Sequence, residues 1–224
     1  MNRGITSRFY NASGVAPQND PESEQSEPRV DLIRPQLARA MVPGMRVLDL
    51  GCGAGRYAFA VEEMGAVPVG IDCASVPLAH ARQVPQRRGS HTCFVEGDYR
   101  ALLFVPASFD AALFINNIVE CSYDEADLLV RQLQIILAPG GVFCLSMPDY
   151  LAQHQENGRD LAEFDPETSN MEALYRIPGH GRLPYSLYFW SAGFARHVCS
   201  RYLELCGDEK LSAGYRWLVF RKRP

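Results

Sequence analysis

The stretch VLDLGCGAGRY, residues 47–57, constrains the fold of this chain more than any other part of the sequence. It begins as an apolar run interrupted only by Asp49, and a short apolar run bounded by turn residues is typical of a strand buried on both faces of a parallel sheet. Apolar residues then recur with helical spacing at Tyr57, Ala60, Val61 and Met64. We therefore expect a strand, a glycine turn and a helix, with free backbone N–H groups where the helix begins.

The spacing of the glycines separates two kinds of ligand-binding turn. A dinucleotide-binding turn reads G-x-G-x-x-G, and from Gly51 and Gly53 its third glycine would fall at position 56, which is Arg56. The third glycine is instead Gly55, which gives D-x-G-x-G-x-G counted from Asp49. A carboxylate beside the loop repels a pyrophosphate and attracts a cation. The pattern therefore argues against a nicotinamide oxidoreductase.

At Asp49, Gly51, Gly53 and Gly55 the sequence resembles the first motif of the class I S-adenosylmethionine-dependent methyltransferases. The resemblance implies that Asp49 faces the amino group of the methionine part of S-adenosylmethionine (SAM), and that S-adenosylhomocysteine is the product. SAM carries an ammonium and a sulfonium group and no phosphate, so a carboxylate beside the glycines would attract it.

Segments of strand character alternate with segments of helical spacing after residue 45. The expected strands cover residues 46–50, 67–72, 92–96, 109–116 and 141–147. A helix before the last of these begins at Ser122, where Glu125 completes a capping-box pattern. This alternation predicts an α/β fold with a doubly wound, mostly parallel sheet and helices on both faces. The resemblance implies a Rossmann-like methyltransferase sheet whose last strand is antiparallel.

The chain divides into four segments around this core. Residues 1–44 form an N-terminal arm, with a flexible acidic linker and a leading helix, and residues 45–148 form the SAM-binding core. Residues 149–186 interrupt the alternation, and the resemblance implies that this insert is a lid over the substrate. Residues 187–224 supply a C-terminal helix and the closing strands of the same domain.

Further cofactor contacts are expected at the carboxyl edge of the sheet. Asp72 ends the second strand about 20 residues after the glycines, where an acid can accept hydrogen bonds from ribose hydroxyls or cap the next helix. The resemblance implies that Asp98 accepts from the adenine amino group and that Tyr99 lends its backbone N–H. It also places Asn116 beside the methionine part. Asp98 read without the resemblance is a turn aspartate.

The residues that act on the methyl acceptor are much less visible. Methyl transfer from a sulfonium is an in-line displacement, and much of its acceleration can come from positioning the nucleophile. A general base is needed only where the acceptor loses a proton late. The candidates are His154 and His180 in the insert, which exposed loop positions also explain, and Tyr10 in the arm.

The composition of the chain limits the kinds of partner and compartment that are expected. The 224 residues carry a formal net charge of −4 with a pI of about 5.7, which does not favour nucleic acid or an anionic membrane as partner. The seven cysteines never form C-x-x-C, which favours reduced thiols in a cytoplasm over a disulfide frame or a metal site. No stretch has the length and apolarity of a signal peptide or a membrane span.

These observations predict a cytoplasmic SAM-dependent methyltransferase that acts on an O, N or C atom of a small molecule. Two alternatives remain open: a protein or RNA methyltransferase, and a SAM-binding partner subunit without catalysis of its own. The sequence leaves the acceptor and the oligomeric state undetermined.

Overall fold

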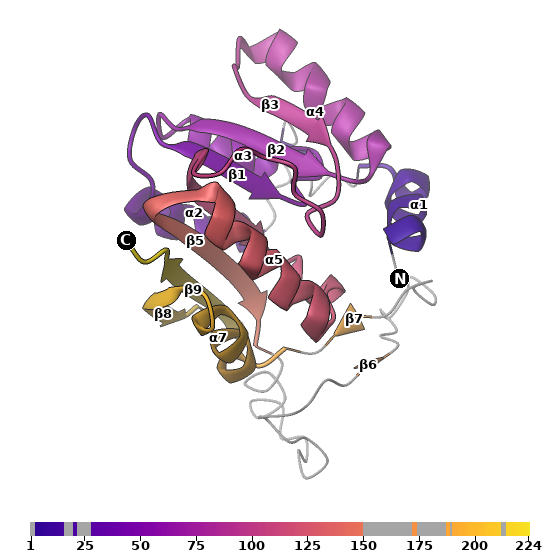
Figure 1. Ribbon diagram of the computed structural model, residues 1–224. Helices are drawn as coiled ribbons and strands as arrows, with labels where there is room; N and C mark the ends of the chain where they lie inside the picture. The colour runs from indigo at the N-terminus through magenta and orange to yellow at the C-terminus, as the bar shows by residue number, and fades with distance from the viewer. Residues whose placement is uncertain are drawn as a thin grey trace.

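The computed structural model describes residues 3–15, 20–21, 28–149, 172–173, 187–188, 190–211 and 214–224. Its main sheet has seven strands in the order β3-β2-β1-β4-β5-β9-β8 (Figure 1). These are β1 (Arg46–Leu50), β2 (Val67–Asp72), β3 (Cys93–Glu96), β4 (Phe109–Ile115), β5 (Leu137–Pro148), β8 (Glu204–Lys210) and β9 (Tyr215–Arg221). Two short strands, β6 (Glu172–Ala173) and β7 (Leu187–Tyr188), pair with each other apart from this sheet.

The pairing pattern confirms the predicted fold class. Strands β1 to β5 pair in parallel, with Asp49 of β1 lying between Gly70 of β2 and Leu113 of β4. Strand β9 runs antiparallel to both of its neighbours, β5 and β8. The sheet is therefore mostly parallel, and the last strand of the chain is antiparallel, as expected from the resemblance.

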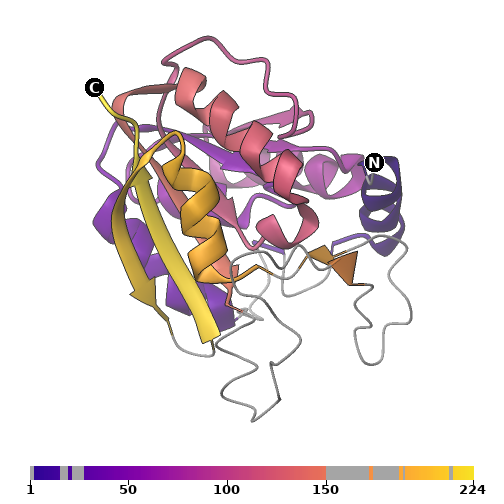
Figure 2. The same ribbon diagram turned by 60° about the horizontal axis from the view of Figure 1, so that its bottom comes forward.

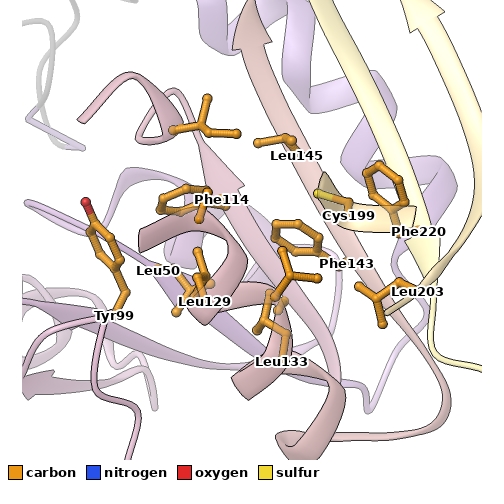
Figure 3. Packing of buried hydrophobic residues seen from close by; sticks show 14 of the residues in the cluster. Leu50, Tyr99, Phe114, Leu129, Leu133, Phe143, Leu145, Cys199, Leu203 and Phe220 are labelled. Carbon is orange, nitrogen blue, oxygen red and sulfur yellow. The ribbon is translucent and has the colours of Figure 1, made fainter. Parts of the chain in front are cut away.

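Helices cover both faces of the sheet and bury its apolar side chains (Figure 2). One face packs against α5 (Tyr123–Ile136) and α7 (Ala192–Ser200), through a cluster that includes Leu133 and Phe143 (Figure 3). The other face packs against α2 (Pro28–Ala40), α3 (Arg56–Glu62) and α4 (Ser75–Arg88). Full burial of one such side chain stabilises the fold by about 1.5–3 kcal/mol.

The capping box predicted for the start of α5 is confirmed. The Glu125 N–H donates to the Ser122 Oγ at 3.3 Å, and the Ser122 N–H donates to Glu125 Oε2 at 2.9 Å. These two bonds satisfy backbone donors that the first turn of a helix leaves without partners. The first turn of α5 is thereby fixed directly after the segment that follows β4.

Two elements differ from the sequence expectation. Strand β5 begins at Leu137, not after the APGG turn, because Leu137 is already extended and Pro139 disfavours a helical conformation at the preceding residue. The register between β4 and β5 accordingly shifts between Phe109 and Ala111. The N-terminal arm contains a helix, α1 (Arg3–Ser13), that was not predicted from the sequence.

The architecture places the site at one edge of the sheet. The carboxyl ends of β1, β2 and β4 meet there because these strands are parallel neighbours. Figure 1 shows α1 beyond the arrowheads of β1 and β2, at this same edge. Among the described residues, no helix combines the length and apolarity that a membrane crossing requires.

Candidate functional site

The glycine turn between β1 and α3 has a backbone that favours glycine. Gly51, Gly53 and Gly55 have φ values of +68°, +52° and +88°, in the left-handed region that strains other residues. A Cβ on Gly51 would lie 2.5 Å from the Nδ2 atom of Asn117, so this position is also sterically closed. A Cβ on Gly53 would meet no described atom within 4 Å. The middle of the turn therefore presents open backbone.

Asp49 is buried at the end of β1, directly below the turn. Asp49 is only 2% exposed, and its carboxylate accepts a hydrogen bond from the backbone N–H of Ala58, in the first turn of α3. Its Oδ2 atom has no hydrogen-bond partner among the described residues. Burial and, to a lesser extent, repulsion from Asp72 raise the pKa of Asp49, the Ala58 hydrogen bond lowers it, and the net pKa is about 7. A buried acceptor of this kind needs a donor, and a cationic donor suits it best.

Asp72 ends β2 and holds the glycine turn. Its carboxylate accepts from the N–H of Gly53 at 2.8 Å and from the N–H of Ala74 at 2.8 Å. Burial raises the pKa of Asp72, although these backbone hydrogen bonds oppose the increase. The bond to Ala74 forms a local turn just before α4, and the Val76 N–H in the first turn of α4 donates to Asn11 Oδ1 instead of to Asp72. An ionised carboxylate has about four acceptor positions, so capacity remains for a ligand's hydroxyl groups.

Asp98 and Tyr99 lie on the loop after β3, and each is 7% exposed. Asp98 Oδ1 accepts from the backbone N–H of Arg100 at 2.9 Å, in a local turn. The Tyr99 ring packs edge-on against Phe114 with centroids 5.1 Å apart. The Arg100 guanidinium lies 4.9 Å from the Tyr99 ring centroid and forms an ion pair with Glu125 at 2.9 Å. The loop is thus tied to the body of the sheet.

Asn116 and Asn117 follow β4 and have different roles in the structure. Asn116 has a positive φ of 61°, donates its backbone N–H to the Ser146 carbonyl at 2.8 Å and accepts from the Ser146 hydroxyl at 3.4 Å. Asn117 donates its Nδ2 to the carbonyl of Leu50 at 2.7 Å and to that of Gly51 at 3.2 Å. Asn117 therefore links the ends of β1 and β4. Sequence reasoning assigned a role only to Asn116.

Glu120 is a second residue that sequence reasoning missed. It ends a short 3-10 helix (Ile118–Glu120), and its Oε1 accepts from the hydroxyl of Tyr10 at 2.7 Å. Burial raises the pKa of Glu120, the Tyr10 hydrogen bond lowers it and Asp72 raises it, and the net pKa is about 7. Tyr10 and Glu120 are separated by 110 residues, so no local sequence pattern marks the pair.

The acids at this edge fit a ligand that carries positive charge. Asp72 lies within electrostatic reach of Asp49, Asp98 and Glu120, and Arg100 is the cation that acts on Glu120. The unpaired Oδ2 of Asp49 and the open backbone at Gly53 match the ammonium and the close approach of SAM. A dinucleotide pyrophosphate would meet repulsion at the same place. His154 and His180 fall outside the described residues.

Comparison with known proteins agrees with this geometry. Residues 47–141 match the model of a family described as a methyltransferase domain. The chain is 31% identical over 140 residues to the cypemycin N-terminal methyltransferase of a Streptomyces species, covering 62% of this chain and 56% of the relative. It is 33% identical over 135 residues to the trans-aconitate 2-methyltransferase of Acidovorax ebreus, covering 59% and 48%.

The fold is shared across almost the whole chain with a solved structure. The crystal structure of the PH0226 protein from Pyrococcus horikoshii superposes with a TM-score of 0.79 at 22% identity, over 96% of this chain and 99% of that one. The chain spans about half the length, or less, of the curated relatives it matches. Residues 47–141 are therefore similar to a methyltransferase domain, and the sheet and the acid–glycine turn fit the SAM-dependent methyltransferases that the sequence resembles.

Proposed function

We propose that this protein transfers the methyl group of SAM to a small-molecule acceptor. The observation that carries the proposal is the buried carboxylate of Asp49, whose Oδ2 lacks a partner in the described structure and lies beside the open glycine turn. A buried acceptor without a donor costs about 1–3 kcal/mol. A bound ammonium group would donate a hydrogen bond to Oδ2 of Asp49 and so remove this cost. The site therefore favours a cationic ligand.

Each acid of the site would hold a different part of the cofactor. Asp49 would accept from the ammonium group, and Asp72 would accept from the ribose hydroxyls through the lone pairs that the backbone leaves free. Asp98 and the backbone of Tyr99 would bind the adenine, and Asn116 would lie next to the methionine part. Gly53 would allow the cofactor to approach the backbone closely.

When bound, SAM would supply a methyl group attached to a sulfonium. The lone pair of the acceptor forms a bond to the methyl carbon, the C–S bond breaks, and its electron pair returns to sulfur. The chain's own acids, Asp49, Asp72 and Asp98, would orient the donor. His154 and His180 remain the candidates for removing a proton from an acceptor that needs it. Tyr10 is a weaker candidate because its hydroxyl already donates to Glu120.

The proposed acceptor is small for two reasons. The acidic chain provides no general attraction for a polyanion such as RNA. One relative that aligns over more than half of this chain is named for a small acid, trans-aconitate. The relative named for the N-terminus of cypemycin supports a peptide acceptor as the second candidate.

The test begins with ligand binding. A ligand at about 100 times its dissociation constant stabilises a fold by about 2.7 kcal/mol, which in a chain of this size raises the melting temperature by roughly 5–10 °C. SAM and S-adenosylhomocysteine should produce this shift and NAD should not. A shift with NAD alone would refute the proposal.

Acceptors are then compared with SAM labelled in its methyl group. Pools of small carboxylic acids, phenols and amines form one arm, and short peptides with free N-termini form the other. Transfer of label to a small molecule supports the first candidate, and transfer to peptides alone supports the second. A protein that binds SAM and labels neither pool would behave as the non-catalytic binding subunit.

A further inference from the structure

The loop after β3 begins beside Asp72, the acid expected at the ribose. The Gly97 N–H donates to the Asp72 carbonyl at 2.9 Å, which joins the start of the loop to the end of β2. Burial is the main cause of the raised pKa of Asp72, and the charge of Asp98 adds to it, so the two carboxylates lie within electrostatic reach. A nucleoside held through its ribose at Asp72 would therefore present its base to the residues of this loop.

Arg100 fixes the carboxylate of Asp98 through two of its own groups. Its backbone N–H donates to Asp98 Oδ1 at 2.9 Å, and its Nη1 forms an ion pair with the same oxygen at 3.5 Å. The side chain of Arg100 is only 11% exposed and that of Asp98 only 6%. Contacts of this kind between charged groups are stronger than neutral ones, so they restrict the rotation of the carboxylate. An ionised carboxylate has about four acceptor positions, and these two donors use positions on one oxygen only.

Helix α5 holds Arg100 in turn. The Arg100 Nε lies 2.9 Å from Glu125 Oε1, and the other oxygen of Glu125 accepts from the Ser122 N–H in the capping box. Gln132, further along α5, donates its Nε2 to the Arg100 carbonyl at 3.2 Å and accepts from the Leu102 N–H at 2.7 Å. The guanidinium and the backbone of Arg100 are thus both bound to the same helix.

The guanidinium of Arg100 also contacts Tyr99, the residue expected to bind adenine through its backbone N–H. It lies 4.9 Å from the centroid of the Tyr99 ring, and its Nη2 donates to the Tyr99 hydroxyl at 3.4 Å. The ring itself packs edge-on against Phe114, with centroids 5.1 Å apart (Figure 3). One arginine therefore contacts both of the residues that are expected at the adenine.

We propose that Arg100 is a positioning residue for recognition of the base, because it holds Asp98 and Tyr99 where they distinguish an amino group from an oxygen on the ring. The inference rests on the proposed function, since it needs the adenine of SAM to lie at this loop. Asp98 would accept from the exocyclic amino group of adenine. A base with a carbonyl oxygen at that position would bring this oxygen against the carboxylate with no proton between them. A site discriminates in this way only if residues behind it keep its polar groups in place.

The experiment measures by calorimetry the affinities for S-adenosylhomocysteine and for S-inosylhomocysteine, which differ in whether the base carries an amino group or an oxygen. The wild-type protein should prefer S-adenosylhomocysteine at least about tenfold, because a hydrogen bond to a charged group is lost with the other ligand. Arg100→Met keeps the length of the side chain and removes the guanidinium. We expect the preference to fall to about threefold or less in this variant.

The matched control is Arg201→Met, which removes a second arginine bound to a carboxylate and to tyrosine. The Arg201 Nη1 donates to Asp127 Oδ1 at 2.7 Å and to the Tyr123 hydroxyl at 2.8 Å, and its guanidinium lies 5.6 Å from the Tyr202 ring centroid. None of these partners is expected to touch the cofactor. Arg201→Met should therefore keep the wild-type preference for S-adenosylhomocysteine.

A second pair of variants acts on Arg100 without replacing it. Glu125→Gln removes the charge that holds the Arg100 guanidinium, so the preference should fall in the same direction as in Arg100→Met, by a smaller factor. Ser122→Ala removes the hydroxyl that caps α5 and leaves the ion pair of Glu125 in place, so it should keep the preference. This pair still tests the proposal if Arg100→Met does not fold.

The outcomes separate the proposal from the proposed function. If the wild-type protein binds neither SAM nor S-adenosylhomocysteine, the proposed function fails and the inference fails with it. If the wild-type protein binds them but does not prefer S-adenosylhomocysteine to S-inosylhomocysteine, the inference alone is overturned. It is also overturned if Arg100→Met and Glu125→Gln weaken both ligands equally and so keep the preference, or if Arg201→Met lowers the preference as much as Arg100→Met does.

Discussion

Replacing Asp49 with asparagine should remove most of the pH dependence of SAM binding below pH 7. In the free protein, burial raises the pKa of Asp49 to about 7, so a large fraction of this carboxyl is protonated near neutrality. The ammonium of SAM binds the ionised form. Asp49 must therefore be ionised when SAM is bound, so protonation of Asp49 in the free protein lowers the apparent affinity for SAM.

The magnitude follows from the pKa. With a value of 7, about half of the Asp49 carboxyls are ionised at pH 7 and about one in eleven at pH 6. The apparent affinity of the wild-type protein should thus fall about fivefold from pH 7 to pH 6, and about sixteenfold by pH 5.5. Glu120, whose pKa is also about 7, faces Tyr10, Asp72 and Arg100 and adds a smaller dependence in the same range.

Isothermal titration at pH 5.5, 6, 6.5 and 7 measures this effect, and two buffers of different ionisation enthalpy count the protons released. The Asp49→Asn protein should bind SAM at least about tenfold more weakly at pH 7, and its affinity should change far less with pH. If the SAM affinity of the two proteins changes equally with pH, or if the wild-type affinity is constant from pH 5.5 to 7, the assigned role of Asp49 is refuted.

The same carboxyl makes the free protein less stable as the pH rises. Its folded pKa lies above its unfolded value of about 3.9, so the folded state binds more protons and stability is lost between about pH 4 and pH 7. In urea denaturation, Asp49→Asn should therefore gain stability relative to wild type on going from pH 4 to pH 7. If the difference in unfolding free energy between the two proteins is the same at every pH, the ionisation of Asp49 does not destabilise the folded state and the argument fails.

Three further predictions concern the turn, the ribose ligand and the insert. Asp72→Ala should weaken SAM binding at least about tenfold, measured by calorimetry, and should also lower the unfolding free energy by about 1 kcal/mol because it removes the acceptor of the Gly53 and Ala74 N–H groups. Gly51→Ala should destabilise the protein by at least about 1 kcal/mol more than Gly89→Ala in urea; both glycines have φ near +67°, but only Gly51 faces a crowding side chain. His154→Ala and His180→Ala should keep SAM affinity within about threefold, and at least one should slow methyl transfer roughly 10²–10⁴-fold if it is a general base; two fully active variants would remove both from the reaction.

Local patterns in the sequence were sufficient to locate the parallel strands and to place Asp49 and Asp72 at the ends of β1 and β2. The predicted second strand, 67–72, is β2 to the residue, because an apolar run between glycine and aspartate leaves little choice of boundary. Asp49 and Asp72 could be located because each stands next to the turn or strand end that defines it. The roles of all the expected cofactor residues, Asp49 and Asp72 included, remain predictions.

Contacts between distant segments were beyond the reach of such patterns. Helix α1 is stabilised by hydrogen bonds to residues more than 60 positions away, such as the bond from Ser7 to Cys73. The Tyr10–Glu120 pair and the bonds from Asn117 to the end of β1 depend on the order of strands in the sheet. Tyr10 could be identified in the sequence only as an aromatic residue near the N-terminus.

The position of β9 between β5 and β8 determines when the sheet can be completed during synthesis. Strand β5 ends at Pro148, and its partner β9 begins only at Tyr215. Until β9 has left the ribosome, β5, whose residues 143–148 are all buried in the folded protein, presents an unpaired edge of the kind to which other chains add. Pairing across so long a separation also slows folding. A chain truncated before β9 should therefore aggregate even though every residue of the cofactor turn is present.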